Sequence, residues 1–468
     1  MESKYKNLLV NIAVFALNVF ATKLITFLLV PLYTYNLSTA EFGVTDMALT
    51  VVTLLVPLVT LSISDALLRF VIDDGKNADR YISIGFMVMV ISCCVVAALL
   101  PILDLSVFGG LGAYKFQFLL LYITNAFLIF HGNIARSLNQ LRLMTWDAII
   151  TSLLTGILAV LLISVLKLGV NGYFGSLTAA SLVGVAIYVV AGGHLGRLKR
   201  VNSQDKSLVM RLFKYAIPLV PNALFWWVGT SINRFFITGM IGIAASGLFA
   251  AASKLPNLLN IIYNIFQQAW TLSAFQEYGE KDNDGYFTTV YRVLLSGMAS
   301  GAALLILFSP LLAAIMLQKD FYSSWTLIPI LVIAFFFNSL NSFYGTVFTT
   351  TLKTVPLFTT TIAGALASIA STWLLIPVIG LNGACVAMVI SNFIVFALRV
   401  YSAASVITIH VKWIRFVTTT VLLALQASVM SVQIGPYIPI SAVLTILVIL
   451  INGIELVRMG KRLLGTDK

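Results

Sequence analysis

The stretch Leu168-Gly169-Val170-Asn171-Gly172 recurs 211 residues later as Ile379-Gly380-Leu381-Asn382-Gly383. Each copy separates two long apolar segments. A turn preference alone would explain either copy, because glycine and asparagine favour tight turns. A second pair, Gly43 and Gly247, recurs at the similar spacing of 204 residues, each glycine at the start of an apolar segment. The two pairs together predict an internal repeat.

Apolar segments fill the chain on both sides of these turns. Of the 468 residues, 60% are hydrophobic and 10% are charged, and the mean hydropathy is +0.99. Soluble domains carry about 25% charged residues, and a membrane-spanning helix needs about 20 apolar residues. We therefore predict an all-α polytopic membrane protein with fourteen transmembrane helices. The predicted spans are 8–33, 44–68, 81–103, 115–136, 146–166, 172–193, 212–238, 246–275, 288–310, 324–350, 355–377, 380–402, 412–432 and 437–457.

The distribution of positive charge tests this count. With the N-terminus in the cytoplasm, 23 of the 29 Lys and Arg residues fall in cytoplasmic segments, and three, Lys115, Lys167 and Lys319, fall outside. The positive-inside rule predicts this asymmetry, and an error of one span would destroy it. We therefore expect both termini in the cytoplasm. The net charge of +12 then records membrane topology, and we expect no nucleic-acid partner.

The repeat divides the predicted spans into two equivalent halves. We predict an N-terminal six-helix bundle over 1–205 and a C-terminal six-helix bundle over 206–402. Residues 403–468 then hold two additional transmembrane helices. Parallel repeats of this kind are typical of transporters, which place the substrate path between the halves.

Four stretches resemble one known family. They are Phe27-Leu28-Leu29-Val30-Pro31-Leu32-Tyr33-Thr34, Leu37-Ser38-Thr39-Ala40-Glu41-Phe42-Gly43, Gly247-Leu248-Phe249-Ala250-Ala251-Ala252-Ser253-Lys254-Leu255-Pro256 and Gly380-Leu381-Asn382-Gly383-Ala384. They are similar to motifs of bacterial polysaccharide (Wzx-type) flippases of the multidrug/oligosaccharidyl-lipid/polysaccharide exporter superfamily. The resemblance covers nearly the whole chain and includes the fourteen-span plan.

This resemblance implies a fold and a function. The fold would be two six-helix bundles in a V around a central cavity, opening alternately to each side. The function would be the outward movement of an undecaprenyl-diphosphate-linked oligosaccharide across the bacterial cytoplasmic membrane. The product would be capsule, exopolysaccharide or another cell-surface polysaccharide. Partners would be the lipid-linked oligosaccharide, membrane lipid, a polysaccharide polymerase and glycosyltransferases, and the protein would be a monomer.

Polar side chains follow one face of several predicted spans, which favours a water-filled cavity. In 246–275, for example, eight polar side chains fall within about 140° of a helical projection. The alternative is hydrogen bonding between packed helices, and for an aromatic residue it is contact with lipid or the core. The candidate cavity-lining residues are Asn18, Asn222, Trp226, Asn233, Asn257, Asn260, Asn264 and Gln267.

Three cations, Lys23, Arg234 and Lys254, lie inside predicted spans with few acidic residues at similar depth. A charge in the membrane is costly, so it normally faces a cavity or a partner. Arginine offers a planar fork that fits phosphate oxygens, and lysine acts as a point charge. We predict that these cations bind the substrate diphosphate. Pairing with carboxylates alone is the other interpretation.

The sequence predicts a transporter without enzymatic activity. It has no Walker-type phosphate loop and no Ser/His/Asp grouping, and its cysteines and histidines are too scattered to suggest a metal or a cofactor. Asp46 and Asp65 are therefore the acidic candidates for ion coupling within the predicted spans. Structural pairing, such as Asp65 with Arg69, is the alternative role for these two carboxylates.

Two other functions fit parts of this pattern. An ion-coupled multidrug exporter of the same superfamily would have the same architecture, but such exporters usually use buried carboxylates to attract organic cations. A membrane-embedded polysaccharide polymerase or glycosyltransferase would need large outer loops. No outer loop predicted here exceeds about a dozen residues.

Overall fold

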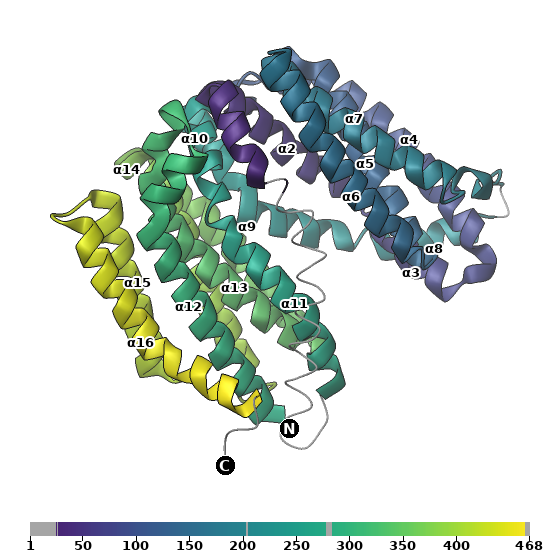
Figure 1. Ribbon diagram of the computed structural model, residues 1–468. Helices are drawn as coiled ribbons and strands as arrows, with labels where there is room; N and C mark the ends of the chain where they lie inside the picture. The colour runs from purple at the N-terminus through teal and green to yellow at the C-terminus, as the bar shows by residue number, and fades with distance from the viewer. Residues whose placement is uncertain (1–24, 26, 203–204, 278–282, 464–468) are drawn as a thin grey trace. The chain divides into compact units, whose positions relative to one another are not determined.

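The computed structural model describes residue 25 and residues 27–202, 205–277 and 283–463. Throughout these residues the chain forms helices and short connections, without a β-strand (Figure 1). The predicted all-α fold class is therefore confirmed. The first predicted span, 8–33, lies largely outside the described residues. Of the helix at its end, residues 27–36 are described.

The described helices form two compact units, Leu24–Gly247 and Leu248–Lys468. The helices of the first unit are α2 (Thr39–Val59), α3 (Ile63–Asp73), α4 (Ala78–Leu99), α5 (Lys115–Ser137), α6 (Leu141–Ala159), α7 (Gly169–Val190), α8 (Lys206–Ala216) and α9 (Leu219–Met240). Helix α10 (Ile243–Lys254) carries the boundary. The second unit contains α11 (Asn257–Glu277), α12 (Asn283–Met316), α13 (Ile328–Thr350), α14 (Val355–Ala403), α15 (Trp413–Val432) and α16 (Tyr437–Leu463).

Among the described residues, eleven helical segments are long and apolar enough to cross a membrane. Breaks and mergers explain much of the difference from fourteen. Helix α14 contains both 355–377 and 380–402, joined through the non-helical residues Ile379 and Gly380. The predicted span 246–275 is divided into the short helix α10 and α11. The count of fourteen stays a prediction.

The repeated turn has the same backbone geometry in both copies. Gly169 has a φ of 56° and Gly380 a φ of 57°, in the left-handed region that glycine adopts without strain. Three residues later, Gly172 and Gly383 lie against backbone carbonyls of the preceding helix. A Cβ atom on Gly172 would be 2.9 Å from the Leu162 oxygen, and one on Gly383 would collide with the Leu375 oxygen. Both glycines are therefore required by close helix packing.

The other repeated glycines, Gly43 and Gly247, pack against each other. A Cβ atom on Gly43 would collide with the Ile243 carbonyl oxygen, and one on Gly247 would collide with the Thr39 carbonyl oxygen. Helices α2 and α10 thus cross at backbone contact. Helix α2 begins at a capping box, in which the Ser38 hydroxyl accepts from the Glu41 amide and the Glu41 carboxylate accepts from the Ser38 amide.

The basic segment around the boundary between the predicted halves, which includes Arg197, Lys199 and Arg211, contacts the rest of the first unit through ion pairs and a ring contact. Asp79 at the start of α4 pairs with Arg197 at 3.1 Å and with Lys199 at 2.9 Å. Arg211 of α8 lies over the Phe70 ring of α3, 4.9 Å from its centroid. Contacts also place α9 against α2 in this unit. The compact units divide after Gly247. The boundary at 205/206 between the two repeated six-helix halves is a separate division, and it stays a prediction.

The last two helices, α15 and α16, pack on α12 (Figure 1). Buried polar side chains join the three helices. The Gln426 amide of α15 donates to the Ser441 and Thr445 hydroxyls of α16, at 2.9 and 2.8 Å, and to the Ala303 carbonyl of α12 at 3.0 Å. Hydrogen bonds between helices can replace the hydrophobic driving force that is missing within a lipid bilayer. These bonds hold α15 and α16 as part of the second unit.

Candidate functional site

Arg234 and Asp46 form a buried ion pair in the first unit. The Arg234 Nε atom of α9 is 2.6 Å from a carboxylate oxygen of Asp46 on α2, and the two side chains are 19% and 8% exposed. Two turns before Arg234 on α9, the Trp227 indole donates a 3.1 Å hydrogen bond to the Thr50 carbonyl of α2. It also lies 3.3 Å from the Thr53 hydroxyl of α2. For Arg234 the structure thus shows the carboxylate pairing that the sequence analysis gives as the other interpretation, and diphosphate binding stays a prediction. The polar face of α2 packs against α9.

The predicted cavity residues of α9 differ in exposure. Asn222, Trp226 and Asn233 share one helix face by their spacing. Asn222 is exposed and Trp226 is 62% exposed, whereas Asn233 is buried with 1% exposure. The exposed end of this face could contact a ligand, and the buried end belongs to the core of the unit.

The predicted residues of the second unit begin at Lys254, which is half-buried. On α11, Asn257 and Asn264 are exposed, while Asn260 and Gln267 are half-buried. Asn260 donates to Asn257 at 3.2 Å and accepts a 3.1 Å hydrogen bond from Asn338 on α13. Helix–helix hydrogen bonding thus explains Asn260. Asn257 and Asn264 retain exposed polar surface.

Three further predicted residues lie elsewhere. Asn18 and Lys23 fall outside the described residues. Asp65 is exposed on α3, and Arg69 pairs with Asp73 at 2.8 Å, one turn further along the helix. Asp65 therefore occupies a surface position, whereas Asp46 is held by Arg234.

The second unit contains a buried cation that is not among the predicted site residues. Arg399 of α14 lies near the end of the predicted span 380–402, where it counts as cytoplasmic, yet it is only 9% exposed. It donates to the Asn341 carbonyl at 2.6 Å, the Thr360 hydroxyl at 3.2 Å and the Thr361 hydroxyl at 3.3 Å. No carboxylate of the described residues forms an ion pair with it. Asn392, seven residues before Arg399, lies on the same helix face, and this polar spacing is the signal that the sequence offers. In the structure Asn392 accepts a 3.2 Å hydrogen bond from Asn341.

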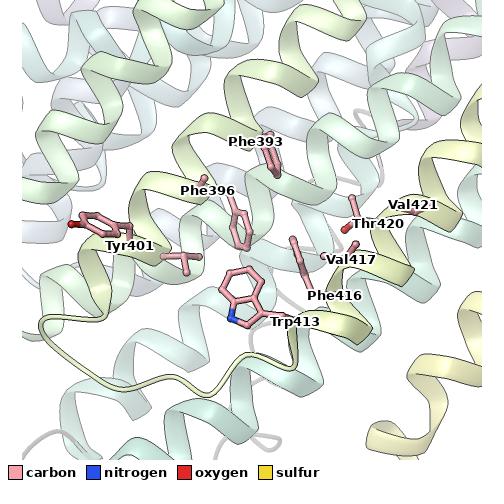
Figure 2. A pocket seen from close by; sticks show the side chains of 10 residues that line it. Phe393, Phe396, Tyr401, Trp413, Phe416, Val417, Thr420 and Val421 are labelled. Carbon is pink, nitrogen blue, oxygen red and sulfur yellow. The ribbon is translucent and has the colours of Figure 1, made fainter.

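An apolar groove lies between α14 and α15 (Figure 2). Its volume is about 510 Å³. Phe396 stacks on Phe416 at a centroid distance of 5.0 Å and forms its floor, and both rings are buried. Its outer residues are exposed, Tyr401 at 83% and Trp413 at 53%. The remaining lining residues are Phe393, Ala397, Val400, Val417, Thr420 and Val421. Such a lining can hold a hydrocarbon chain.

Comparison with known proteins places the chain in a family. The family model described as "Polysaccharide biosynthesis protein" matches residues 8–271, more than half of the chain. The chain belongs to this polysaccharide biosynthesis protein family. A search of the curated proteins finds no match.

Solved structures show that this family member has the fold of the multidrug/oligosaccharidyl-lipid/polysaccharide exporter superfamily. It is similar to a lipid II flippase MurJ in an inward closed conformation, with a TM-score of 0.72, 14% identity, and coverage of 94% of this chain and 98% of that chain. It is also similar to an inward-facing multidrug resistance MATE family transporter, with a TM-score of 0.67, 13% identity, and coverage of 93% and 96%. A mutant of the Vibrio cholerae MATE transporter VcmN matches with a TM-score of 0.57, 17% identity, and coverage of 86% and 98%. The resemblance to polysaccharide flippases of this superfamily is confirmed.

Proposed function

We propose that this protein is a flippase for an undecaprenyl-diphosphate-linked oligosaccharide and moves it outward across the bacterial cytoplasmic membrane for cell-surface polysaccharide synthesis. The match of the polysaccharide biosynthesis family model to residues 8–271 carries the proposal. The superfamily fold supports a transporter. The proposal includes fourteen spans, cytoplasmic termini, a monomer, and a polymerase and glycosyltransferases as partner enzymes.

The diphosphate would be bound by Lys23, Arg234 and Lys254. Arg234 would bind the diphosphate through its terminal N–H groups, because its Nε–H group already donates to Asp46. A guanidinium has five N–H donors in a planar fork, so phosphate oxygens can bind to the same arginine that a carboxylate holds in position. Asp46 then orients Arg234 and limits the cost of its burial when substrate is absent. The polar substrate moiety would meet the exposed side chains Asn222, Trp226, Asn257 and Asn264.

The isoprenoid chain would occupy the groove between α14 and α15. The groove has an apolar lining and an exposed outer edge, as a site open to membrane hydrocarbon requires. Burying a hydrocarbon chain there replaces contacts with lipid tails, so shape rather than the hydrophobic effect would give selectivity.

Export of the glycan tests the proposal. We expect two variants to abolish surface polysaccharide in cells that depend on this protein, with unchanged amounts of the protein in the membrane. Arg234→Lys keeps a positive charge beside Asp46 but loses the planar fork that binds phosphate oxygens, and Lys254→Ala removes the second cation. The control is Arg69→Ala, which removes an exposed ion pair outside the proposed site and should leave export unchanged. Normal export in both site variants would overturn the cationic site.

The same strains distinguish the multidrug alternative, which the MATE-like fold keeps open. Deleting the gene should remove surface polysaccharide and leave drug susceptibility unchanged if the substrate is a lipid-linked glycan. Loss of drug resistance with intact polysaccharide would favour the exporter. In a binding assay, a diphosphate-linked lipid should raise the thermal stability of the purified protein more than a neutral sugar lipid.

A further inference from the structure

Asp147 on α6 is a buried carboxyl group that the proposed substrate site does not use. It is 5% exposed, in the second turn of the helix. Helix α7 comes close to it at Gly184, where a Cβ atom would lie 2.8 Å from Asp147 Oδ1. The same Cβ atom would meet Thr151 of α6 at 2.7 Å and Leu128 of α5 at 2.8 Å. The carboxyl group is thus enclosed by α5, α6 and α7 within the first unit.

The described part of the chain offers no positive charge to pair with this carboxyl group, and a hydrogen bond from Tyr188 reaches it. Asp147 forms no ion pair with a described cation, and its Oδ1 atom accepts no hydrogen bond from the described residues. Tyr188 of α7 donates a hydrogen bond to the carboxyl group, but a neutral phenol contributes no positive charge.

Histidines lie behind that tyrosine. The His194 ring stacks on Tyr188 at 5.8 Å, and its Nδ1 atom is 3.1 Å from Nδ1 of His131 on α5. Burial, together with the nearby Arg197, lowers the pKa of His194 to about 4, so it is neutral at pH 7. Arg197 itself pairs with Asp79. These groups therefore provide no counter-charge for Asp147.

Asp46 in the same unit shows the usual solution for a buried carboxylate. It is 7% exposed, similar to Asp147, but Arg234 lies 2.6 Å away and stabilises its charged form. Without such a partner, burial favours the neutral carboxylic acid. A carboxylate also needs hydrogen-bond donors at both oxygens, whereas a neutral acid needs fewer.

We propose that Asp147 is a proton-binding site: its carboxyl group carries a proton while α5, α6 and α7 enclose it and releases that proton to water when they part. The bound ligand is one proton on a carboxylate oxygen, and its release leaves a carboxylate and a hydronium ion. This inference goes beyond the proposed function, because it assigns a coupling ion and its site. It also replaces Asp46 and Asp65 as the leading coupling residues, since the first is ion-paired and the second is exposed.

Infrared spectroscopy of the purified full-length protein tests the site without any transport substrate. At neutral pH we expect a carbonyl band of a protonated carboxylic acid that disappears in Asp147→Asn. The band should remain in Asp320→Asn, which changes an exposed aspartate in the other unit. A wild-type protein without such a band at neutral pH, or a band that persists in Asp147→Asn, would overturn the proposal.

Tyr188→Phe gives a second readout if Asp147→Asn does not fold. Removing the phenol changes the environment of the acid, so the carbonyl band should shift in frequency while keeping its intensity. A band that does not move would show that the protonated group lies elsewhere. In vesicles, glycan-lipid flipping by the wild type should respond to a pH gradient, and Asp147→Asn should lose this response. Loss of flipping in all conditions for the wild type would instead count against the proposed function, with the infrared result unaffected.

Discussion

The two units stabilise a buried arginine in different ways. In the first unit, Arg234 meets the carboxylate of Asp46 at 2.6 Å. In the second unit, Arg399 meets a backbone carbonyl and two threonine hydroxyls, at distances of 2.6 to 3.3 Å. An ion pair leaves a full charge behind when one partner is removed, whereas neutral acceptors leave only unsatisfied dipoles. The difference predicts different mutational costs.

The largest effect is expected for Asp46→Asn. This substitution removes the carboxylate that pairs with the buried Arg234 guanidinium, and breaking a buried pair in this way costs about 3–5 kcal/mol. The thermal unfolding temperature of the purified protein should fall sharply. The double variant Asp46→Asn/Arg234→Gln should recover much of the loss, because it removes both charges. If Asp46→Asn unfolds no earlier than the exposed control Asp73→Asn, the ion pair contributes no stability.

A smaller effect is expected for Arg399→Met. It removes three hydrogen bonds from a charged donor, but no charge is left behind, and we expect a loss of about 2–3 kcal/mol. Arg399→Lys should recover only part of it, since one ammonium cannot reach three acceptors arranged around a planar fork. The same unfolding measurement checks both. A cost for Arg399→Met above that of Asp46→Asn would show that the two arginines are not held as described.

These arginines also show how far the sequence predicts the site. Periodicity and charge predicted the helices and the depth of Arg234, because a 20-residue apolar span is a local property. The partner of Arg234 could not be predicted, since it depends on the packing of α9 against α2, which are 188 residues apart at the ion pair. Arg399 lies three residues before the end of the predicted span 380–402 and counts as cytoplasmic in the predicted charge distribution. Only its tertiary contacts show that it is buried.

The buried aspartates also show that burial by a distant helix cannot be predicted from the local sequence. Asp46 and Asp147 are both acidic residues in apolar helices, but only Asp46 is among the acidic candidates for ion coupling that the sequence predicts. Position in the predicted span put Asp147 near the helix end, where a charge is inexpensive. Gly184 on α7 removes it from solvent, because a glycine allows the two helices to approach closely.

The smallest effect is expected for Thr361→Val. Thr361 accepts the longest of the three Arg399 hydrogen bonds, at 3.3 Å, and valine keeps its shape. Losing one such acceptor should lower the free energy of unfolding by about 1 kcal/mol. The matched control is Thr359→Val on the same helix, because Thr359 is exposed and bonds only to its own backbone. Equal unfolding temperatures for the two variants would show that Arg399 is held by Asn341 and Thr360 alone. A clear difference would show that even the weakest of three neutral acceptors helps to hold a cation that no described carboxylate neutralises.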